Sequence, residues 1–307
     1  MPQAIAGVLA PVVTPFKADL TPDAGRFVRH CRWLVDNGVG LAAFGTNSEA
    51  NSLAVGERVE LLERLVAAGV APARLMPGTG TCALPDTVRL TTHAVALGCA
   101  GVLMLPPFYY KGVSDEGLFR SFAEVIERVG DARLSIYLYH IPPVAQVPIS
   151  LALIERLLDR YPGTIAGIKD SSGDWSNTKA MLERFAPRGF DVFVGSESFL
   201  LANLRGGGRG CISATANVNP RAIHALYAGW QAANAEAMQQ RLGVRAAFQK
   251  QPMIPALKQA VANWSGDPQW ARVRPPQVEL TAAQSAALIA DLERLGFDMP
   301  GLPSADA

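Results

Sequence analysis

The segment Ile165–Ser171 has the sequence IAGIKDS, a short run of apolar and small residues that ends in a lysine, an aspartate and a serine. Near-continuous apolar runs of this length are typical of strands in a parallel sheet that is covered on both faces. Similar runs occur elsewhere in the chain, at Gly7–Phe16, Gly40–Thr46, Leu75–Thr81, Gly101–Phe108, Ser135–Ile141, Asp191–Glu197 and Gly210–Asn217. With Ile165–Ser171, they predict eight strands.

The intervals between these runs have helical periodicity. Asp23–Asp36 places Phe27, Cys31 and Leu34 on one stripe, as a helix with one buried face requires. Comparable patterns occupy Glu57–Ala68, Asp86–Leu97 and Glu116–Val129. Eight alternations of strand and helix predict a closed (β/α)8 TIM barrel. The alternative is an open doubly wound sheet, but that fold usually has a G-x-G-x-x-G fingerprint after its first strand, and the first run here lacks one.

The pattern changes at about Asn219, after which only helical segments follow. They occupy Arg221–Ala233, Ala235–Lys250, Pro255–Trp264 and Ala282–Leu295. We therefore expect residues 1–220 to form the barrel as a catalytic domain and residues 221–307 to form a C-terminal helical extension.

The composition excludes several classes of protein. Of the 307 residues, 49% are apolar and 18% are charged, which suits a large core, and the formal net charge of +1 gives no basic excess for nucleic acid. No apolar run approaches the ~18 residues of a membrane span, and the first residues do not resemble a secretory signal, so we expect no membrane partner.

Cysteine and histidine residues are scattered. The cysteines, Cys31, Cys82, Cys99 and Cys211, are far apart and form no C-x-x-C pair. No H-x-x-x-H pair occurs either, so no metal site is expected. We interpret the cysteines as free thiols in a reducing cytoplasm.

Polar residues gather where the predicted strands end, and in a TIM barrel the carboxyl ends of the strands carry the active site. The clusters are Gly45-Thr46-Asn47-Ser48-Glu49, Tyr139-His140, Lys169-Asp170-Ser171, Gly195-Ser196-Glu197-Ser198, and Ser213 with Thr215. We expect these clusters to supply the catalytic and substrate-binding groups.

Lys169 is the most informative of these residues. In a strand it shares one face with Ile165 and Gly167, and the glycine leaves room for a long side chain. An apolar barrel interior disfavours the ammonium form, and a neutral amine can attack a ketone to form an imine. The alternative is a lysine on the surface at an irregular strand end. Tyr139 shares a face with Tyr137 and can shuttle protons, or it can be an ordinary core tyrosine.

Two glycine-containing segments could bind an anion, and we interpret them differently. The turn Gly45–Ser48 can expose consecutive N–H groups to an anion such as a carboxylate, and Thr46 can relay a proton. Its alternative is a plain connecting loop. The glycine run Gly206–Gly208 precedes the last strand, on the rim opposite the chemistry, so we interpret it as a tight connection and not as a phosphate site.

Six segments in the same order resemble the dihydrodipicolinate synthase and N-acetylneuraminate lyase family of class I aldolases. They are VVTPF (Val12–Phe16), GTNSE (Gly45–Glu49), LPPFYY (Leu105–Tyr110), YLYHIPP (Tyr137–Pro143), IAGIKDSSGD (Ile165–Asp174) and GCISATANV (Gly210–Val218). The resemblance covers most of the chain and implies an enzyme that acts on pyruvate or a related 2-keto acid through a covalent Schiff base. It implies no metal or organic cofactor, and commonly a homotetramer built as a dimer of dimers.

The resemblance also implies roles for matching residues. Lys169 would form the imine, Tyr139 would be the proton shuttle, and Thr46 would connect it to a tyrosine of a neighbouring subunit, Tyr109 or Tyr110. Other residues would bind substrate: Gly45, Thr46 and Asn47 at the carboxylate, Ile212 and Ser213 near the pyruvyl group, and Glu197 and Ser198 at sugar hydroxyls.

One departure bears on the substrate. Val144 stands where the lysine-pathway synthases have an arginine that binds the carboxylate of the aldehyde, and valine cannot make that contact. Asn47, which stands where the family often has threonine, occurs in some hydroxy-oxo-acid aldolases and sugar-acid dehydratases. We therefore favour an aldolase or dehydratase of a hydroxylated 2-keto acid, with dihydrodipicolinate synthase as the alternative. A non-catalytic keto-acid-binding homologue and a phosphate-binding barrel isomerase are rivals from other classes.

Overall fold

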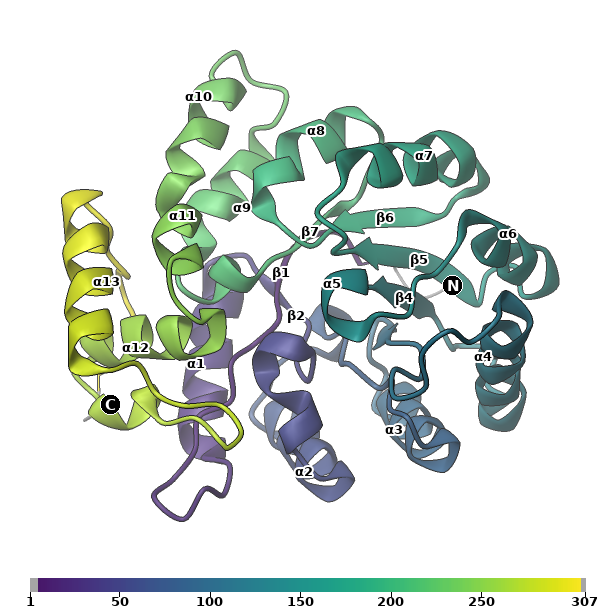
Figure 1. The fold of residues 1–307 in the computed structure, drawn as a ribbon, viewed down its shortest axis with the longest axis horizontal. Helices are drawn as coiled ribbons and strands as arrows, with labels where there is room; N and C mark the ends of the chain where they lie inside the picture. Colours follow the sequence, from purple (N-terminus) through teal and green to yellow (C-terminus); the bar gives the residue numbers. More distant parts are fainter. Residues whose placement is uncertain (1–4, 305–307) are drawn as a thin grey trace. The chain divides into compact units, whose positions relative to one another are not determined.

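The computed structural model describes residues 5–304, and the chain has an α/β fold with C-terminal helices (Figure 1). Its seven described strands are assigned to one sheet. The chain divides into two compact units. The first unit contains the residues up to Gly7 together with Ala71–Ile212, and the second contains Val8–Val70 together with the residues from Ser213 onward.

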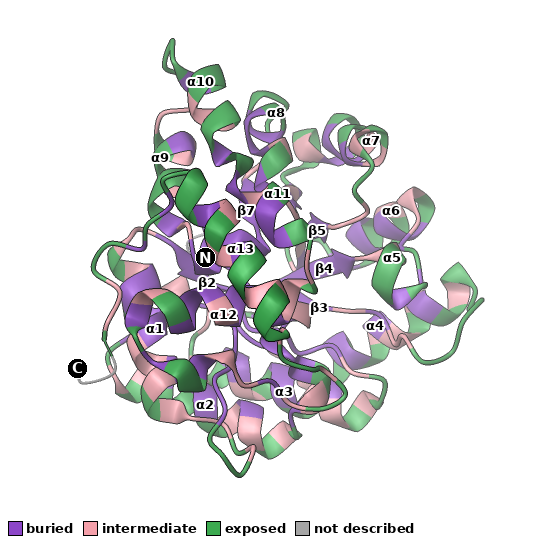
Figure 2. Ribbon diagram, turned by 60° about the vertical axis from the view of Figure 1, so that its left-hand side comes forward, coloured by how far each residue is buried: buried purple, intermediate pink, exposed green. Residues whose placement is uncertain are grey.

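The first unit contains five parallel strands in the order β7-β6-β5-β4-β3. Their bounds are β3 Val102–Met104, β4 Ile136–His140, β5 Ile165–Asp170, β6 Asp191–Val194 and β7 Gly210–Ile212. Every residue of β4 is buried, and Figure 2 shows β4 and β5 in the buried colour. The register pairs Tyr139 with Lys169 and Lys169 with Phe193, so the predicted nucleophile lies on a central, covered strand.

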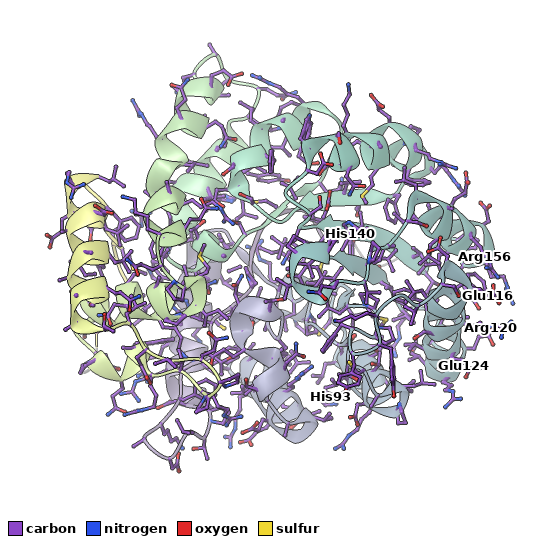
Figure 3. All side chains as sticks on the ribbon, in the orientation of Figure 1. His93, Glu116, Arg120, Glu124, His140 and Arg156 are labelled. Carbon is purple, nitrogen blue, oxygen red and sulfur yellow. The ribbon has the colours of Figure 1, made fainter. Side chains whose placement is uncertain are left out.

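Helices separate these strands along the chain. They are α3 Leu84–Ala96, α4 Asp115–Val129, α5 Pro142–Ala145, α6 Leu151–Arg160, α7 Trp175–Phe185 and α8 Leu200–Arg205. The Ser150 hydroxyl accepts the N–H of Leu153 at the start of α6, at 3.0 Å, which is a typical N-cap contact. The outer faces carry ion pairs: Figure 3 shows Glu116 and Arg120 on α4 and Arg156 on α6.

The second unit contains the parallel pair of β1 (Gly7–Ala10), apart from its first residue, and β2 (Gly40–Leu41). Its longer helices are α1 Ala24–Asp36, α2 Val55–Ala67, α9 Pro220–Ala228, α12 Met253–Ser265 and α13 Ala282–Arg294. Phe27, Cys31 and Leu34 are buried on α1, as their spacing predicts. Figure 2 shows the opposite character in α13, which is largely exposed.

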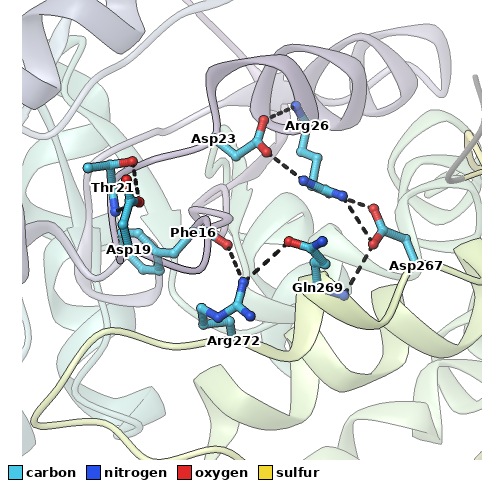
Figure 4. A network of polar contacts seen from close by, with 8 residues as sticks. All are labelled: Phe16, Asp19, Thr21, Asp23, Arg26, Asp267, Gln269 and Arg272. Carbon is cyan, nitrogen blue, oxygen red and sulfur yellow. Dashed lines mark hydrogen bonds and ion pairs between the residues drawn. The ribbon is translucent and has the colours of Figure 1, made fainter.

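A network of ion pairs and hydrogen bonds joins residues 16–26 to residues 267–272 within the second unit (Figure 4). Arg26 contacts Asp23 and Asp267, in each case at 2.5 Å. Arg272 donates to the carbonyl oxygen of Phe16 at 3.3 Å. These bonds fix the segment that follows α12 against the segment that follows β1.

The expected strand at Leu75–Thr81 does not form. The segment has one isolated bridge, between Gly78 and Leu103, and no strand is assigned to it. Pro77 has no N–H to donate. The segment also contains Gly78 and Gly80, and glycine weakens a strand because it has no side chain to pack. The described residues therefore contain seven strands and not the eight of a closed barrel.

Past residue 219 the described chain contains helices and no strand, as its sequence predicts. The expected helix Ala235–Lys250 is divided into α10 (Ala235–Gln240) and α11 (Val244–Gln249) by a 3-10 turn at Arg241–Gly243. Glycine in a helix interior favours such an interruption. A separate domain that begins at residue 221 stays a prediction. Within residues 5–304, no helix combines the length and the apolar character that crossing a bilayer requires.

Candidate active site

Lys169 is buried in the first unit, and its side chain lies against an aromatic ring. Its exposure is only 2%, and its Nζ lies 4.1 Å from the centre of the Tyr139 ring. The contact follows from the sheet, because residues paired in register on adjacent parallel strands present neighbouring side chains. In the described part of the chain, Lys169 forms no ion pair with a carboxylate. The structure therefore brings together the two residues that the sequence predicts to act together.

The floor beneath this pair is apolar and aromatic. Tyr137 is T-shaped against Phe193, with 5.7 Å between ring centres, and its hydroxyl donates to Asp191 at 3.1 Å. A Cβ at Gly167 would lie 2.8 Å from the Tyr137 ring and 2.3 Å from the carbonyl oxygen of Asp191. The room that glycine leaves is therefore used by the floor of the site, and not directly by Lys169.

The residues that follow Tyr139 and Lys169 fasten the strand ends to neighbouring segments. Asp170 accepts the hydroxyl of Thr178 at 2.6 Å, which ties β5 to α7. The Nδ1 of His140 accepts the N–H of Ile149 at 3.0 Å. Burial lowers the pKa of His140, although the charge of Asp170 opposes the shift. His140 therefore acts as a neutral structural acceptor at physiological pH.

The remaining predicted residues of the first unit differ in exposure. Ile212 is the last residue of β7 and is fully buried. Glu197 is also buried, whereas Ser198 beside it is exposed. Tyr109 and Tyr110 are 74% and 72% exposed and contact each other edge to face at 5.3 Å. The two tyrosines thus lie on the surface of this chain and do not join the buried Lys169–Tyr139 pair.

The second unit contains the predicted anion-binding turn. Thr46–Ser48 form a short 3-10 helix, and Gly45 donates its N–H to the Ser48 hydroxyl at 3.2 Å. Thr14 donates to the carbonyl of Ser48 at 2.7 Å, which ties the turn to the segment after β1. Thr46 and Asn47 are its partly exposed members. A helical turn aims its first N–H groups outward from its start, so these two residues can meet an anion.

Ser213 is the second unit's other predicted site residue, and it has an unexpected neighbour. Arg245, on α11, donates to its hydroxyl oxygen at 3.1 Å. Ser213 is buried, and its N–H donates to Leu9 at 3.2 Å. Sequence reasoning missed Arg245, because nothing in a helical pattern indicates that a half-buried arginine reaches back to the end of a distant strand.

Lys258 was also missed. It lies on α12, fully buried, and forms an ion pair with Glu49 at 2.7 Å. The available signal was a lone lysine in the apolar stretch MIPALKQAV (Met253–Val261). A charge inside such a stretch requires a buried partner, but the sequence does not identify which one.

No group of three histidine, cysteine or acidic side chains within residues 5–304 has the arrangement of a metal site. His93 and His140 lie on separate elements, as Figure 3 shows. Burial raises the pKa of the Cys99 thiol to about 12 and that of Cys31 well above its usual range, so neither thiol is a nucleophile at neutral pH.

Comparisons with known proteins agree with this arrangement. Residues 4–295 match the Dihydrodipicolinate synthetase family. An "Uncharacterized DapA-like lyase" of Chloroflexus aurantiacus is 34% identical over 294 residues, which is 94% of this chain and 96% of that protein. A 4-hydroxy-tetrahydrodipicolinate synthase of Acidiphilium cryptum is 33% identical over 242 residues, or 77% of this chain and 80% of that protein.

Solved structures give the same result. Dihydrodipicolinate synthase from Agrobacterium tumefaciens superposes with a TM-score of 0.88 at 32% identity, covering 95% of this chain and 99% of that one. YagE of E. coli K12, a prophage protein of the dihydrodipicolinic acid synthase family solved in complex with pyruvate, has a TM-score of 0.88 at 28% identity. That match covers 96% of this chain and all of YagE.

Proposed function

The chain belongs to the dihydrodipicolinate synthetase family, and we propose that it is an aldolase or dehydratase of a hydroxylated 2-keto acid, with Lys169 as its nucleophile. Enzymes of this family are pyruvate-dependent lyases that form a covalent Schiff base through a lysine and need no external cofactor. This protein is such a lyase. The observation that carries the residue assignment is the buried Nζ of Lys169, 4.1 Å from the centre of the Tyr139 ring.

In the proposed reaction, the neutral amine of Lys169 attacks the C2 carbonyl carbon of the keto acid. The carbonyl oxygen takes up protons and leaves as water, so that an iminium forms. In an aldol cleavage the iminium withdraws the electrons of the C3–C4 bond, the C4 hydroxyl gives up its proton, and C4 leaves as an aldehyde while an enamine remains. Protonation of C3 and hydrolysis of the imine by water then release pyruvate and the free amine. In a dehydration C3 instead loses a proton to give the enamine, and the C4 hydroxyl takes up a proton and leaves as water.

Tyr139 is the proposed proton carrier of these steps. Its ring lies against the amine and is 2% exposed. A phenol can accept the proton that leaves the amine and donate it to the departing oxygen, and it can transfer the proton in the reverse direction during hydrolysis. The aromatic floor of Tyr137 and Phe193 keeps bulk water from this side of the pair, which limits wasteful hydrolysis of the imine.

The other roles follow from the family resemblance. We assign the substrate carboxylate to Gly45, Thr46 and Asn47, and the pyruvyl group to Ile212 and Ser213. The partly exposed Thr46 and Asn47 of the 3-10 turn support the first assignment. The exposed tyrosines support a contact with another subunit, because an aromatic pair this exposed is typical of an interface. We therefore propose a homotetramer in which Tyr109 or Tyr110 reaches a neighbouring site and connects with Thr46.

The proposal for the second substrate depends on Val144, which is exposed and apolar. It offers no bidentate contact to an aldehyde's carboxylate. Glu197 and Ser198 supply acceptors and donors that suit hydroxyl groups. The alternative is 4-hydroxy-tetrahydrodipicolinate synthase, and it is favoured by the names of several relatives. A cytoplasmic location and the closure of the strands into a (β/α)8 barrel also belong to this proposal.

Trapping with borohydride tests the function directly. The protein is incubated with pyruvate and sodium borohydride, digested, and mapped by mass spectrometry. We expect a reduced pyruvyl adduct on Lys169. Absence of an adduct at saturating pyruvate would contradict the mechanism. A panel of aldehydes offered with pyruvate then distinguishes hydroxylated aldehydes from aspartate semialdehyde, and turnover of the latter alone would favour the synthase.

A further inference from the structure

The ion pair between Lys258 and Glu49 is the most deeply buried charge pair among the described residues. The two side chains are 0% and 1% exposed, and Nζ and Oε1 are 2.7 Å apart. The residues are 209 positions apart in the sequence. Glu49 ends the Thr46–Ser48 turn, and Lys258 comes from α12. One helix of the C-terminal segment therefore holds the end of the proposed carboxylate-binding turn.

Several contacts keep Glu49 in one position. Its Oε2 accepts the backbone N–H of Arg274 at 2.9 Å, while Oε1 accepts from Lys258. Its own N–H donates to the carbonyl of Thr46 at 3.1 Å. Its backbone is left-handed, with φ of 55°, which is uncommon for a side chain of this size. The hydrogen bonds of the Glu49 side chain therefore hold the left-handed backbone of this residue, and that backbone is itself hydrogen-bonded to the carbonyl of Thr46.

Lys258 and Arg274 themselves are held over one aromatic ring. The Nζ of Lys258 lies 4.5 Å and the Cζ of Arg274 lies 4.7 Å from the centre of the Phe16 ring. Arg274 also pairs with both oxygens of Glu57 at 2.8 Å. Arg272 is fixed nearby through the carbonyl of Phe16, as Figure 4 shows. The charges thus form one connected network within the second unit.

A buried ion pair is a poor device for stability alone, because an apolar pair of similar volume often stabilises a protein as well. It does impose one geometry on both partners, since each charge must meet the other. We therefore look for a role of the Lys258–Glu49 pair other than stability.

We propose that Lys258 is a positioning residue for substrate binding, which acts through Glu49 to hold Thr46 and Asn47 in the conformation that receives the carboxylate of the 2-keto acid. This inference rests on the proposed function. It separates the roles of two buried lysines: Lys169 reacts with the ketone, and Lys258 sets the turn that binds the acid group. Loss of Lys258 should weaken binding of the keto acid more than it slows the chemistry.

The charge of Lys258 is also sensitive to pH. Burial lowers its pKa to about 8, while Glu49 and Glu279 oppose the shift and Arg272 adds to it. Arg274, the other cation over the Phe16 ring, stays protonated at all relevant pH values. As pH rises through about 8, Lys258 becomes neutral and its pair with Glu49 weakens. The KM for the keto acid should then rise, whereas a variant with arginine at this position should lose that dependence.

The test compares Lys258→Met with the matched control Lys250→Met. Lys250 pairs with Asp291 at 2.8 Å on the exposed face of α11 and α13, so the same substitution there removes a surface pair in the same unit. Steady-state rates with the substrate identified by the panel, and borohydride trapping with pyruvate, are measured for each. We expect Lys258→Met to raise KM, and the pyruvate concentration that gives half-maximal trapping, about tenfold or more. We expect kcat to change less than threefold, and the control to match the wild type.

Lys258→Arg and Glu49→Gln keep the test decisive if Lys258→Met does not fold. We expect the arginine variant to keep a near-normal KM that no longer rises above pH 8, and the glutamine variant to raise KM. A folded Lys258→Met protein with an unchanged KM, or an equal pH dependence in the arginine variant and the wild type, would overturn the inference. If either of these results is found and the wild type still forms the adduct, the role of Lys258 is wrong but the proposed function stands. If the wild type gives no adduct, the proposed function fails and the inference falls with it.

Discussion

Lys169 in the first unit and Lys258 in the second are both buried, and the Nζ atoms lie 4.1 Å and 4.5 Å from the centre of an aromatic ring. They differ in one respect. Lys258 has a carboxylate at 2.7 Å, whereas Lys169 forms no ion pair in the described part of the chain. A carboxylate partner opposes the loss of charge that burial favours and holds the amine in an ion pair, whereas an amine outside an ion pair can be offered to a ketone. The partner, and not burial, distinguishes a structural lysine from a catalytic one.

The largest effect is expected when the lysine without an ion pair is removed. Lys169→Met should abolish the borohydride adduct and lower kcat/KM by on the order of 10⁴-fold or more, because the proposed nucleophile is removed. Lys258→Met should retain the adduct at saturating pyruvate. Mass spectrometry of both trapped variants checks the comparison, and an adduct mapped to Lys258 in the wild type would reverse the two assignments.

A smaller effect is expected from the ring that lies against Lys169. Tyr139→Phe keeps the aromatic contact with Nζ but removes the hydroxyl that carries protons. We expect kcat to fall by roughly 10²- to 10³-fold, while pyruvate still forms the adduct. Single-turnover rates and trapping yields measure the two properties separately. Unchanged turnover would remove Tyr139 from the mechanism and would leave its ring as a packing partner only.

The smallest effect concerns the pH dependence of stability, and it tests whether Lys258 is the buried lysine that titrates in the folded chain. Its pKa is lowered from 10.5 to about 8 in the folded chain. Between these values the unfolded chain binds more protons than the folded one, so the free energy of unfolding should rise with pH over this window. The full contribution is ~3 kcal/mol. Urea unfolding of the wild type and Lys258→Met at pH 7.5 and 10.5 measures the difference, and a wild-type curve parallel to that of the variant would contradict it.

Much of the fold could be predicted because hydrophobic periodicity reports local structure. The helix expected at Asp23–Asp36 is α1, with Asp23 as its N-cap, and the helix expected at Glu116–Val129 begins one residue earlier, as α4. Periodicity failed at Leu75–Thr81, where apolar residues are present but a proline and two glycines prevent a regular ladder. An apolar run shows that a segment has the residue composition of a strand, but it does not show whether the segment pairs regularly with neighbouring strands.

The candidate site divides in the same way. Lys169 and Tyr139 could be found from the sequence because each lies near the carboxyl end of a predicted strand. The structure shows that the two strands are adjacent in the first unit. Lys258 and Arg245 could not, because their partners, Glu49 and Ser213, are 209 and 32 positions away. Contacts over such distances depend on how helices pack, which no local pattern of residues reports. The contacts of Lys258 and Arg245 are therefore visible only in three dimensions.

The pairing of Glu49 with Lys258 also has a consequence for biosynthesis. Glu49 leaves the ribosome 209 residues before its partner, and Arg26 likewise precedes Asp267 by 241. Val8–Val70 of the second unit must therefore wait, with an uncompensated carboxylate at the end of its turn, until more than 200 further residues have been synthesised. Ala71–Ile212 of the first unit is continuous apart from the few residues up to Gly7, so most of its contacts can form on the nascent chain. The proposed carboxylate-binding turn is thus completed only after α12 has been synthesised.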